Sequence, residues 1–236
     1  MNEPILFVPG MMCDARVFGP QIEDLSRDHA IQVARVTHAE TIREMAAEAI
    51  HHAPPRFALA GISMGGIVAM EILRRVPERV TRIALISTTP LSESPEQASW
   101  REPQIVKAQS GNLIDAMRAA MSPDNLGPGP SRARVLAQLD EMAIDIGALA
   151  FIRQSRALQR RPDAQKVLRM TRAPALVLCG AHDQITPVKR HSFMAELIPY
   201  AELAIIEEAG HIPTLETPEK VSLALRAWMD LPMVLR

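Results

Sequence analysis

Short apolar runs alternate with segments of helical periodicity over most of the chain. Between the runs, Thr186-Pro187 and Thr217-Pro218 are typical helix starts, in which an N-cap residue precedes a proline in the first turn. Strands that alternate with helices are typical of a parallel sheet covered on both faces. The pattern therefore predicts an α/β fold with a mostly parallel sheet of about six strands, at residues 5–8, 31–36, 57–62, 83–87, 175–180 and 203–207.

The alternation stops in the middle of the chain. From about residue 91 to residue 168 no strand-like run occurs, and Leu113, Met117 and Met121 recur at helical spacing. A loop rich in glycine and proline, residues 127–130, interrupts this stretch. We therefore expect a single domain built from residues 1–90 and 169–236, with a helical insertion at residues 91–168.

Composition narrows the class of protein. The 236 residues are 47% hydrophobic and 22% charged, which is ordinary for a globular chain with a large core. A net charge of −1 and only 3% aromatic residues argue against a nucleic-acid partner. Cys13 and Cys179 are too few for a disulfide framework or a zinc site, and the histidines lack metal-ligand spacing, so we expect no metal and no cofactor.

No part of the sequence favours a membrane location. The longest stretch without a charged residue, 57–70, is shorter than the roughly 17 residues that a membrane-spanning helix needs. The N-terminus has no basic region of the kind that begins a secretory signal. We therefore expect a cytoplasmic protein, for which a homodimer is one possible state.

A candidate nucleophile lies directly after the third predicted strand. The sequence Gly61-Ile62-Ser63-Met64-Gly65 joins that strand to a helical segment and has the form G-x-S-x-G. Glycines at both flanks allow a tight turn in which larger side chains would collide, and the serine is held in a strained conformation above the sheet edge. The pattern predicts that Ser63 is a nucleophile.

A serine hydroxyl needs a base, and the base needs an acid that orients it. His211 follows the last predicted strand, and Asp183 follows the strand before it. Loops after parallel strands meet at one edge of the sheet, so both residues should reach Ser63. The order Ser, Asp, His along the chain predicts a Ser63–Asp183–His211 triad.

Acyl transfer also needs at least two N–H donors for the oxyanion. The residue after the nucleophile, Met64, supplies one through its backbone. The loop after the first predicted strand should supply the other, and there Met11 is the first choice and Met12 the second.

Three segments together resemble the α/β-hydrolase family: residues 61–66, residues 180–187 and residues 209–219. The resemblance covers the whole chain and implies that the insertion is a helical cap over the pocket. It is strongest to the small capped group that includes 3-oxoadipate enol-lactonases, carbon–carbon bond hydrolases and carboxylesterases. One departure is Pro9-Gly10, where the family usually has His-Gly at the oxyanion loop.

Three functions remain open at this point. The first is hydrolysis of a small ester or lactone through an acyl-enzyme at Ser63. The second is carbon–carbon bond hydrolysis or cofactor-free perhydrolysis by the same residues. The third is ligand binding by a receptor or regulatory protein built on a hydrolase scaffold. The intact triad favours the first two.

Residues that contact the substrate are harder to predict. Arg153, Arg156 and Arg160 share one face of a helix in the insertion, and this face would bind a substrate carboxylate if it looked into the pocket. A solvated arginine stripe is the favoured interpretation. Trp100 and Met12 are further candidates. Packing between the helices of the insertion is the favoured interpretation of Trp100, and core filling is the alternative for Met12.

Overall fold

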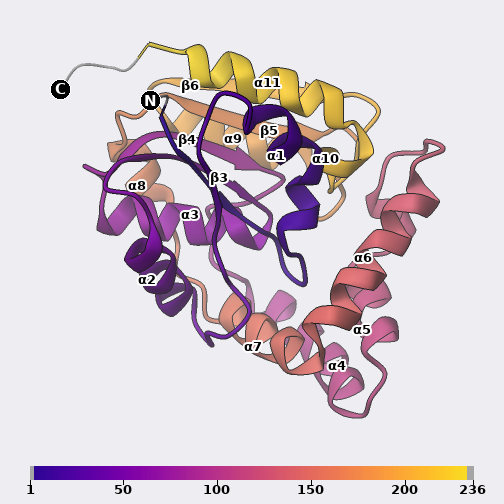
Figure 1. Ribbon diagram of the computed structural model, residues 1–236. Coiled ribbons are helices and arrows are strands. Elements are labelled where there is room, and N and C mark those ends of the chain that lie inside the picture. Colours follow the sequence, from indigo (N-terminus) through magenta and orange to yellow (C-terminus); the bar gives the residue numbers. More distant parts are fainter. Residues whose placement is uncertain (1–2, 233–236) are drawn as a thin grey trace.

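The computed structural model describes residues 3–232 and shows a six-stranded sheet in which all neighbouring strands run parallel (Figure 1). The spatial order is β2-β1-β3-β4-β5-β6. This confirms the predicted fold class and number of strands. The bounds are β1 (Ile5–Val8), β2 (Ile31–Val33), β3 (Phe57–Ile62), β4 (Val80–Ile86), β5 (Ala175–Gly180) and β6 (Ala201–Ile206).

Three strands, β2, β4 and β6, differ in their bounds from the prediction, because the extent of a strand depends on its neighbours. β6 begins at Ala201, two residues earlier than predicted, because Ala201 pairs with Ala175 at the start of β5. β2 stops at Val33, which pairs with Phe7 close to the end of the short strand β1. β4 begins at Val80, before its apolar run, because it pairs with the start of β3. Arg82, in that early part of β4, is buried and forms an ion pair with Glu3. The apolar pattern gave no sign of this extension.

Helices cover both faces of the sheet. Alternate residues of β1 divide between two cores: Ile5 and Phe7 pack with α1 and α11, whereas Leu6 and Val8 pack with α2 and α3. Helix α8 packs against α3 and α9. The first layer contains α1 (Gly19–Leu25), α10 (Pro213–Glu216) and α11 (Pro218–Asp230), and the second contains α2 (Ile42–His52), α3 (Met64–Arg75), α8 (Gln165–Met170) and α9 (Val188–Leu197).

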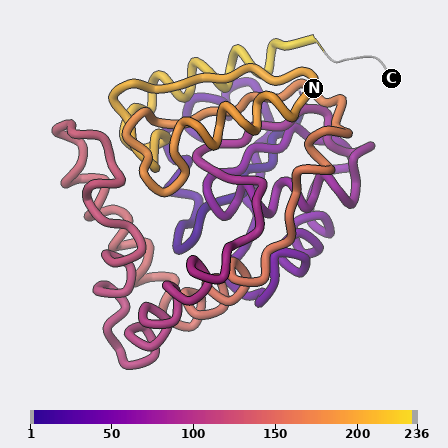
Figure 2. Tube along the Cα trace, turned by 180° about the vertical axis from the view of Figure 1, so that it is seen from behind, coloured from indigo at the N-terminus to yellow at the C-terminus, as the bar shows by residue number. Residues whose placement is uncertain are grey.

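The middle of the chain forms a separate group of helices beside the sheet (Figures 1 and 2). In this group α4 packs against α5 and α7, around a small core that includes Met117 and Phe151. Residue 168, the predicted end of the insertion, lies inside helix α8. This helix packs with the sheet domain. The bounds are α4 (Pro95–Gln109), α5 (Leu113–Ala120), α6 (Arg132–Ile146) and α7 (Ala148–Gln159), with a 3-10 turn, η2 (Pro123–Asn125), between α5 and α6. Another 3-10 turn, η1 (Ala15–Phe18), lies between β1 and α1.

Two predicted helix starts differ in detail. Helix α9 begins at Val188, after Pro187, so Thr186 does not cap it and its hydroxyl bonds elsewhere. Helix α11 does begin with Pro218, but the Thr217 hydroxyl donates to the Pro213 carbonyl instead of capping the helix. In residues 3–232 no helix is long and apolar enough to cross a membrane.

Candidate active site

Ser63 occupies the sharp turn between β3 and α3. Its φ of 53° and ψ of −120° are strained for a residue with a side chain. A Cβ on Gly61 would lie 2.3 Å from the Gly65 carbonyl oxygen, and one on Gly65 would lie 2.0 Å from the Val8 carbonyl oxygen. Only glycine fits at these two positions, which explains the spacing seen in the sequence.

The structure brings together the three residues proposed as a triad. His211 Nε2 lies 2.9 Å from Ser63 Oγ, and His211 Nδ1 lies 2.9 Å from Asp183 Oδ2. His211 and Asp183 are buried. A hydrogen on Nδ1 donates to the carboxylate, so Nε2 is free to accept the hydroxyl proton of Ser63. The arrangement suits proton transfer from Ser63 to His211.

Asp183 is held by further hydrogen bonds from its own loop. Its Oδ1 accepts the N–H groups of Ile185 and Thr186, each at 2.9 Å, and its Oδ2 accepts the Thr186 hydroxyl at 2.6 Å. Burial disfavours the charged form, but His211 and these hydrogen bonds outweigh it and hold the pKa of Asp183 below its ordinary value. Thr186, which the sequence suggested as a helix cap, instead orients the acid.

The His211 loop is held in place by the buried carboxylate of Glu216. Its two oxygens accept the N–H groups of Gly210 at 2.9 Å, Ile212 at 2.8 Å and Gly127 at 2.6 Å. The His211 N–H donates to the Asn125 carbonyl at 2.7 Å. Residues 125–127, from the middle of the chain, therefore help to position His211. Apart from the closeness of Glu216 to His211, no pattern in the sequence indicated this role.

Two backbone N–H groups, those of Met11 and Met64, are the candidate oxyanion donors. Met64 is the first residue of α3, where N–H groups lack helical partners. In the described residues neither its N–H nor that of Met11 has a hydrogen-bond acceptor. The N–H of Met12 donates to Gln154 Oε1 at 2.9 Å, so it is occupied. The geometry therefore separates the two methionines that the sequence left as first and second choice.

Comparisons with known proteins show the family of this chain. A family model described as the alpha/beta hydrolase family matches residues 5–224. The chain belongs to this family. A thermophilic esterase from Thermogutta terrifontis is 26% identical, with a TM-score of 0.88 over 97% of this chain and 90% of that chain. A pimeloyl-[acyl-carrier protein] methyl ester esterase from Nitrosomonas europaea is 26% identical over 71% of this chain and 69% of its own length.

The enol-lactonase from Burkholderia xenovorans LB400 shares the fold of this alpha/beta hydrolase. Its TM-score is 0.85 at 21% identity, over 98% of this chain and 93% of that chain. At this identity the likeness concerns the fold.

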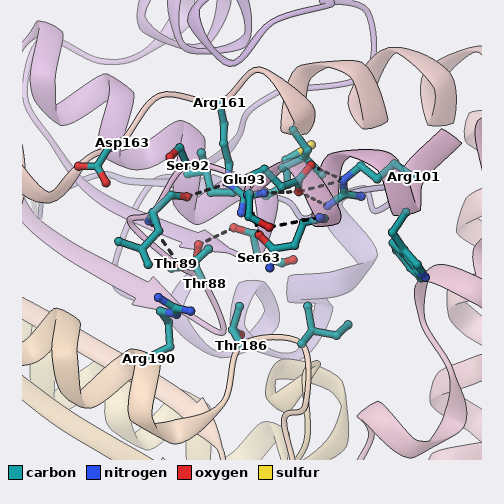
Figure 3. Close-up of a pocket in the computed structure, with 18 of the residues that line it drawn as sticks. Ser63, Thr88, Thr89, Ser92, Glu93, Arg101, Arg161, Asp163, Thr186 and Arg190 are labelled. Atoms are coloured by element: carbon teal, nitrogen blue, oxygen red, sulfur yellow. Dashed lines mark hydrogen bonds and ion pairs between the residues drawn. The ribbon is translucent and has the colours of Figure 1, made fainter.

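Two cavities meet at Ser63 in this hydrolase. The first, here called the arginine cavity, has a volume of about 880 Å³ and is lined by Glu93, Arg101, Arg161 and Arg190 among others (Figure 3). The second, here called the apolar cavity, has a volume of about 260 Å³. Its lining is mainly apolar and includes Met11, Cys13, Val17, Ile62, Met117, Met121, Leu139 and Ile212.

The structure corrects the expected substrate contacts. Arg153 and Arg156 line neither cavity; Arg153 lies 3.6 Å from Glu40, and Arg156 pairs with Glu102. These arginines form surface ion pairs because their face of α7 looks away from Ser63, whereas Gln154 points inward. Met12 is fully buried and packs in the core of the α4–α7 group. Trp100 lines both cavities and is half exposed.

His191 is a buried residue whose importance the sequence did not show. Its Nε2 accepts the Thr88 N–H at 3.0 Å, and the Thr88 hydroxyl donates to the Ser63 carbonyl at 2.7 Å. Burial lowers the pKa of His191 to about 4, so it is neutral at pH 7 and can accept this bond. Through Thr88, His191 supports the backbone of the nucleophile turn.

Two observations concern possible metal ligands and the thiol of Cys13. In residues 3–232 no three His, Cys, Asp or Glu side chains are grouped so that they could hold a metal ion. Cys13 lines the apolar cavity, but burial raises the pKa of its thiol to about 12, so it remains a protonated thiol.

Proposed function

We propose that this alpha/beta hydrolase cleaves a carboxylic ester or a lactone of a small substrate through an acyl-enzyme. The observation that carries the proposal is the continuous hydrogen-bonded path from Ser63 Oγ through His211 to Asp183, with 2.9 Å at each step. The names of its relatives, two esterases and an enol-lactonase, support the same chemistry. Ser63 lines both cavities, which have space for a small molecule at its hydroxyl.

In the first half of the reaction, Ser63 Oγ attacks the substrate carbonyl carbon while His211 Nε2 takes the hydroxyl proton. The N–H groups of Met11 and Met64 stabilise the oxyanion, and Asp183 stabilises the imidazolium. The tetrahedral intermediate collapses as His211 returns its proton to the leaving alcohol oxygen. In a lactone this oxygen stays attached to the acyl group.

In the second half, water replaces the alcohol. His211 takes one proton from the water, whose oxygen attacks the acyl carbon, and the same oxyanion donors hold the second tetrahedral intermediate. When this intermediate collapses, His211 protonates Ser63 Oγ. The products are a carboxylic acid and the free enzyme.

The helices of residues 91–168 have a role in this proposal as a cap. Trp100, Arg101 and Leu158 from these residues line both cavities. Gln154 and Asn125 bond to the loops that carry Met12 and His211. We therefore propose that the insertion shapes the substrate pocket and also steadies the oxyanion and histidine loops.

The test combines active-site labelling with turnover. A fluorophosphonate probe followed by mass spectrometry should label Ser63, and Ser63→Ala should lose at least about 10⁴-fold in kcat for p-nitrophenyl butyrate. Ser99→Ala, at an exposed position on α4, is the matched control and should keep wild-type turnover. An unlabelled Ser63 together with unchanged turnover in Ser63→Ala would refute the mechanism.

A wider substrate panel separates the remaining alternatives. Esters and lactones test the proposal, a vinylogous diketone tests carbon–carbon bond hydrolysis, and peracid formation from acetate and hydrogen peroxide tests perhydrolysis. Labelling of Ser63 without turnover of any of these would favour a ligand-binding role instead.

A further inference from the structure

Three arginines surround the arginine cavity, whereas only one buried carboxylate balances them. Glu93 Oε1 lies 2.8 Å from Arg101 Nη2 and 2.6 Å from Arg161 Nη1. The side chain of Glu93 is 2% exposed, and that of Arg161 is 7% exposed. Both arginines are therefore held in place at the cavity wall, with one negative charge shared between two positive ones (Figure 3).

The third arginine, Arg190 on α9, has no such partner. Within residues 3–232 its guanidinium makes no ion pair or hydrogen bond with a protein group, although its side chain is only partly exposed. Figure 3 shows Arg190 below Thr88 and Thr89, on the other side of the cavity from Arg161. Its charge nevertheless acts on Arg161. The pKa of Arg161 is lowered mainly by burial, and the positive charge of Arg190 contributes a smaller effect in the same direction.

Two further acids line the cavity, but they do not neutralise Arg190. Glu96 is exposed. Asp163 is also exposed, and its two oxygens accept the backbone N–H and the side-chain amide of Gln165, at 3.0 Å and 2.8 Å. Solvated carboxylates screen a partly buried guanidinium only weakly. The inner wall therefore carries three guanidinium groups and one carboxylate, a surplus of positive charge beside the proposed nucleophile.

The apolar cavity, which Ser63 also lines, differs in character from the arginine cavity. It shares Ser63, Trp100 and Arg101 with the arginine cavity, so a substrate at Ser63 extends into both. An apolar wall favours a hydrocarbon group, whereas unpaired guanidinium favours an anion. The two ends of the substrate should therefore differ in polarity.

We infer that the preferred substrate carries a carboxylate besides its ester or lactone carbonyl, and that Arg190 pairs with this carboxylate. Arg101 and Arg161, oriented by Glu93, supply the surrounding positive charge. A guanidinium presents two parallel N–H groups to a carboxylate, which also fixes the distance between the carboxylate and the reacting carbonyl. The inference rests on the proposed function, since Ser63 must be the site of reaction.

Two nearly isosteric esters test the inference. Methyl pentanoate and monomethyl glutarate differ in that a terminal methyl group of the first is a carboxylate in the second. We expect the wild-type protein to prefer monomethyl glutarate by at least about tenfold in kcat/KM at low ionic strength, because of the added ion pair. Salt should reduce the preference, since screening acts on a partly exposed pair.

Variants of Arg190 assign the preference to this residue. Arg190→Gln should reduce the ratio of the two kcat/KM values about tenfold, and Arg190→Lys should retain part of it because the charge remains. Arg160→Gln is the matched control, since Arg160 is exposed and lines neither cavity. It should leave the ratio unchanged.

The possible failures can be told apart. If methyl pentanoate is hydrolysed with dependence on Ser63 but monomethyl glutarate is not preferred, or if Arg190→Gln keeps the preference, the inference is wrong and the proposed function stands. If neither ester reacts and Ser63 is not labelled, the proposed function fails. If Ser63 is labelled but neither ester reacts, protection decides: monomethyl glutarate should slow labelling more than methyl pentanoate, and equal protection would overturn the inference.

Discussion

At the scale of single residues, backbone strain is concentrated around the proposed site. In residues 3–232 the non-glycine residues with positive φ are Met12 at 54°, Ser63 at 53° and Ser87 at 44°. They follow β1, β3 and β4, three adjacent central strands, on the edge where Asp183 and His211 also lie. Each such conformation costs on the order of 1–3 kcal/mol, so packing around the turns must maintain it.

Gly65 shows how tight this packing is. In Gly65→Ala the new Cβ would lie 2.0 Å from the Val8 carbonyl oxygen and 2.5 Å from that of Pro9. Both atoms belong to backbone that cannot move without disturbing β1, so we expect a loss of at least about 2 kcal/mol in the free energy of unfolding. Urea denaturation measures this loss.

Gly129→Ala provides the matched control, because the nearest atom to its Cβ would be Ser131 Oγ at 3.9 Å. Its effect should stay within about 0.5 kcal/mol. Equal effects of the two substitutions would contradict the argument from close packing.

At the scale of elements, one side chain of helix α7 hydrogen-bonds to two segments of the sheet domain. Gln154 is fully buried; its Oε1 accepts the Met12 N–H at 2.9 Å, and its Nε2 donates to the Val36 carbonyl at 2.9 Å. One amide therefore joins α7, the loop after β1 and the segment after β2. By holding Met12, Gln154 also fixes the position of the neighbouring Met11 N–H.

Gln154→Leu should therefore lower kcat, through the proposed oxyanion site, much more than it changes KM. Loss of the acceptor for Met12 lets the Met11 N–H shift, and a displacement of about 1 Å lowers kcat by about 10²-fold. KM for the neutral ester should change much less. Steady-state kinetics with p-nitrophenyl butyrate gives both values.

Gln154→Glu separates the two bonds of this residue. A carboxylate accepts from Met12 but cannot donate to Val36, so it should retain more of kcat than the leucine variant does. If Gln154→Leu keeps its wild-type kcat, Gln154 has no positioning role.

At the scale of the whole molecule, a buried histidine couples stability to pH. His191 on α9 packs behind the nucleophile turn, and Asp183, His211 and Arg190 act on it electrostatically. Its pKa is about 4 in the folded protein against 6.5 for the free side chain. Between these values the unfolded chain binds more protons than the folded one, so stability falls as the pH falls.

The expected loss from pH 7 to pH 5 is about 2 kcal/mol in the free energy of unfolding. His191→Gln can still accept the Thr88 N–H but does not titrate in this range. Over the same interval its loss in the free energy of unfolding should be smaller than that of the wild type by about 2 kcal/mol. Urea denaturation at the two pH values provides the measurement. The lowered pKa of Asp183 acts below this interval, because its stabilising effect is lost only as the pH falls below its ordinary value of 3.8. Identical pH dependence in the two proteins would show that His191 does not contribute.

Much of the fold followed from local patterns. Alternating periodicity predicted the six strands and the helical middle of the chain, because burial of strands and helix faces leaves a regular trace in the sequence. The strand ends were less predictable, as with β2 and β4, because a strand extends only as far as its partner does. The prediction that Thr186 caps a helix was wrong, because the Thr186 hydroxyl donates to Asp183 instead.

The sequence by itself determined which residue types stand at the ends of the strands, including Ser63, Asp183 and His211, because a short motif and the parallel order of strands are local properties. Only the tertiary structure decided which methionine N–H is free, that Gln154 and Glu216 hold the loops, and that Arg190 rather than Arg153 or Arg156 lies at the cavity. Several of those contacts join segments far apart in the chain, as Met12 with Gln154 and Gly127 with Glu216 do. Their partners depend on how the insertion packs against the sheet, which no local pattern records.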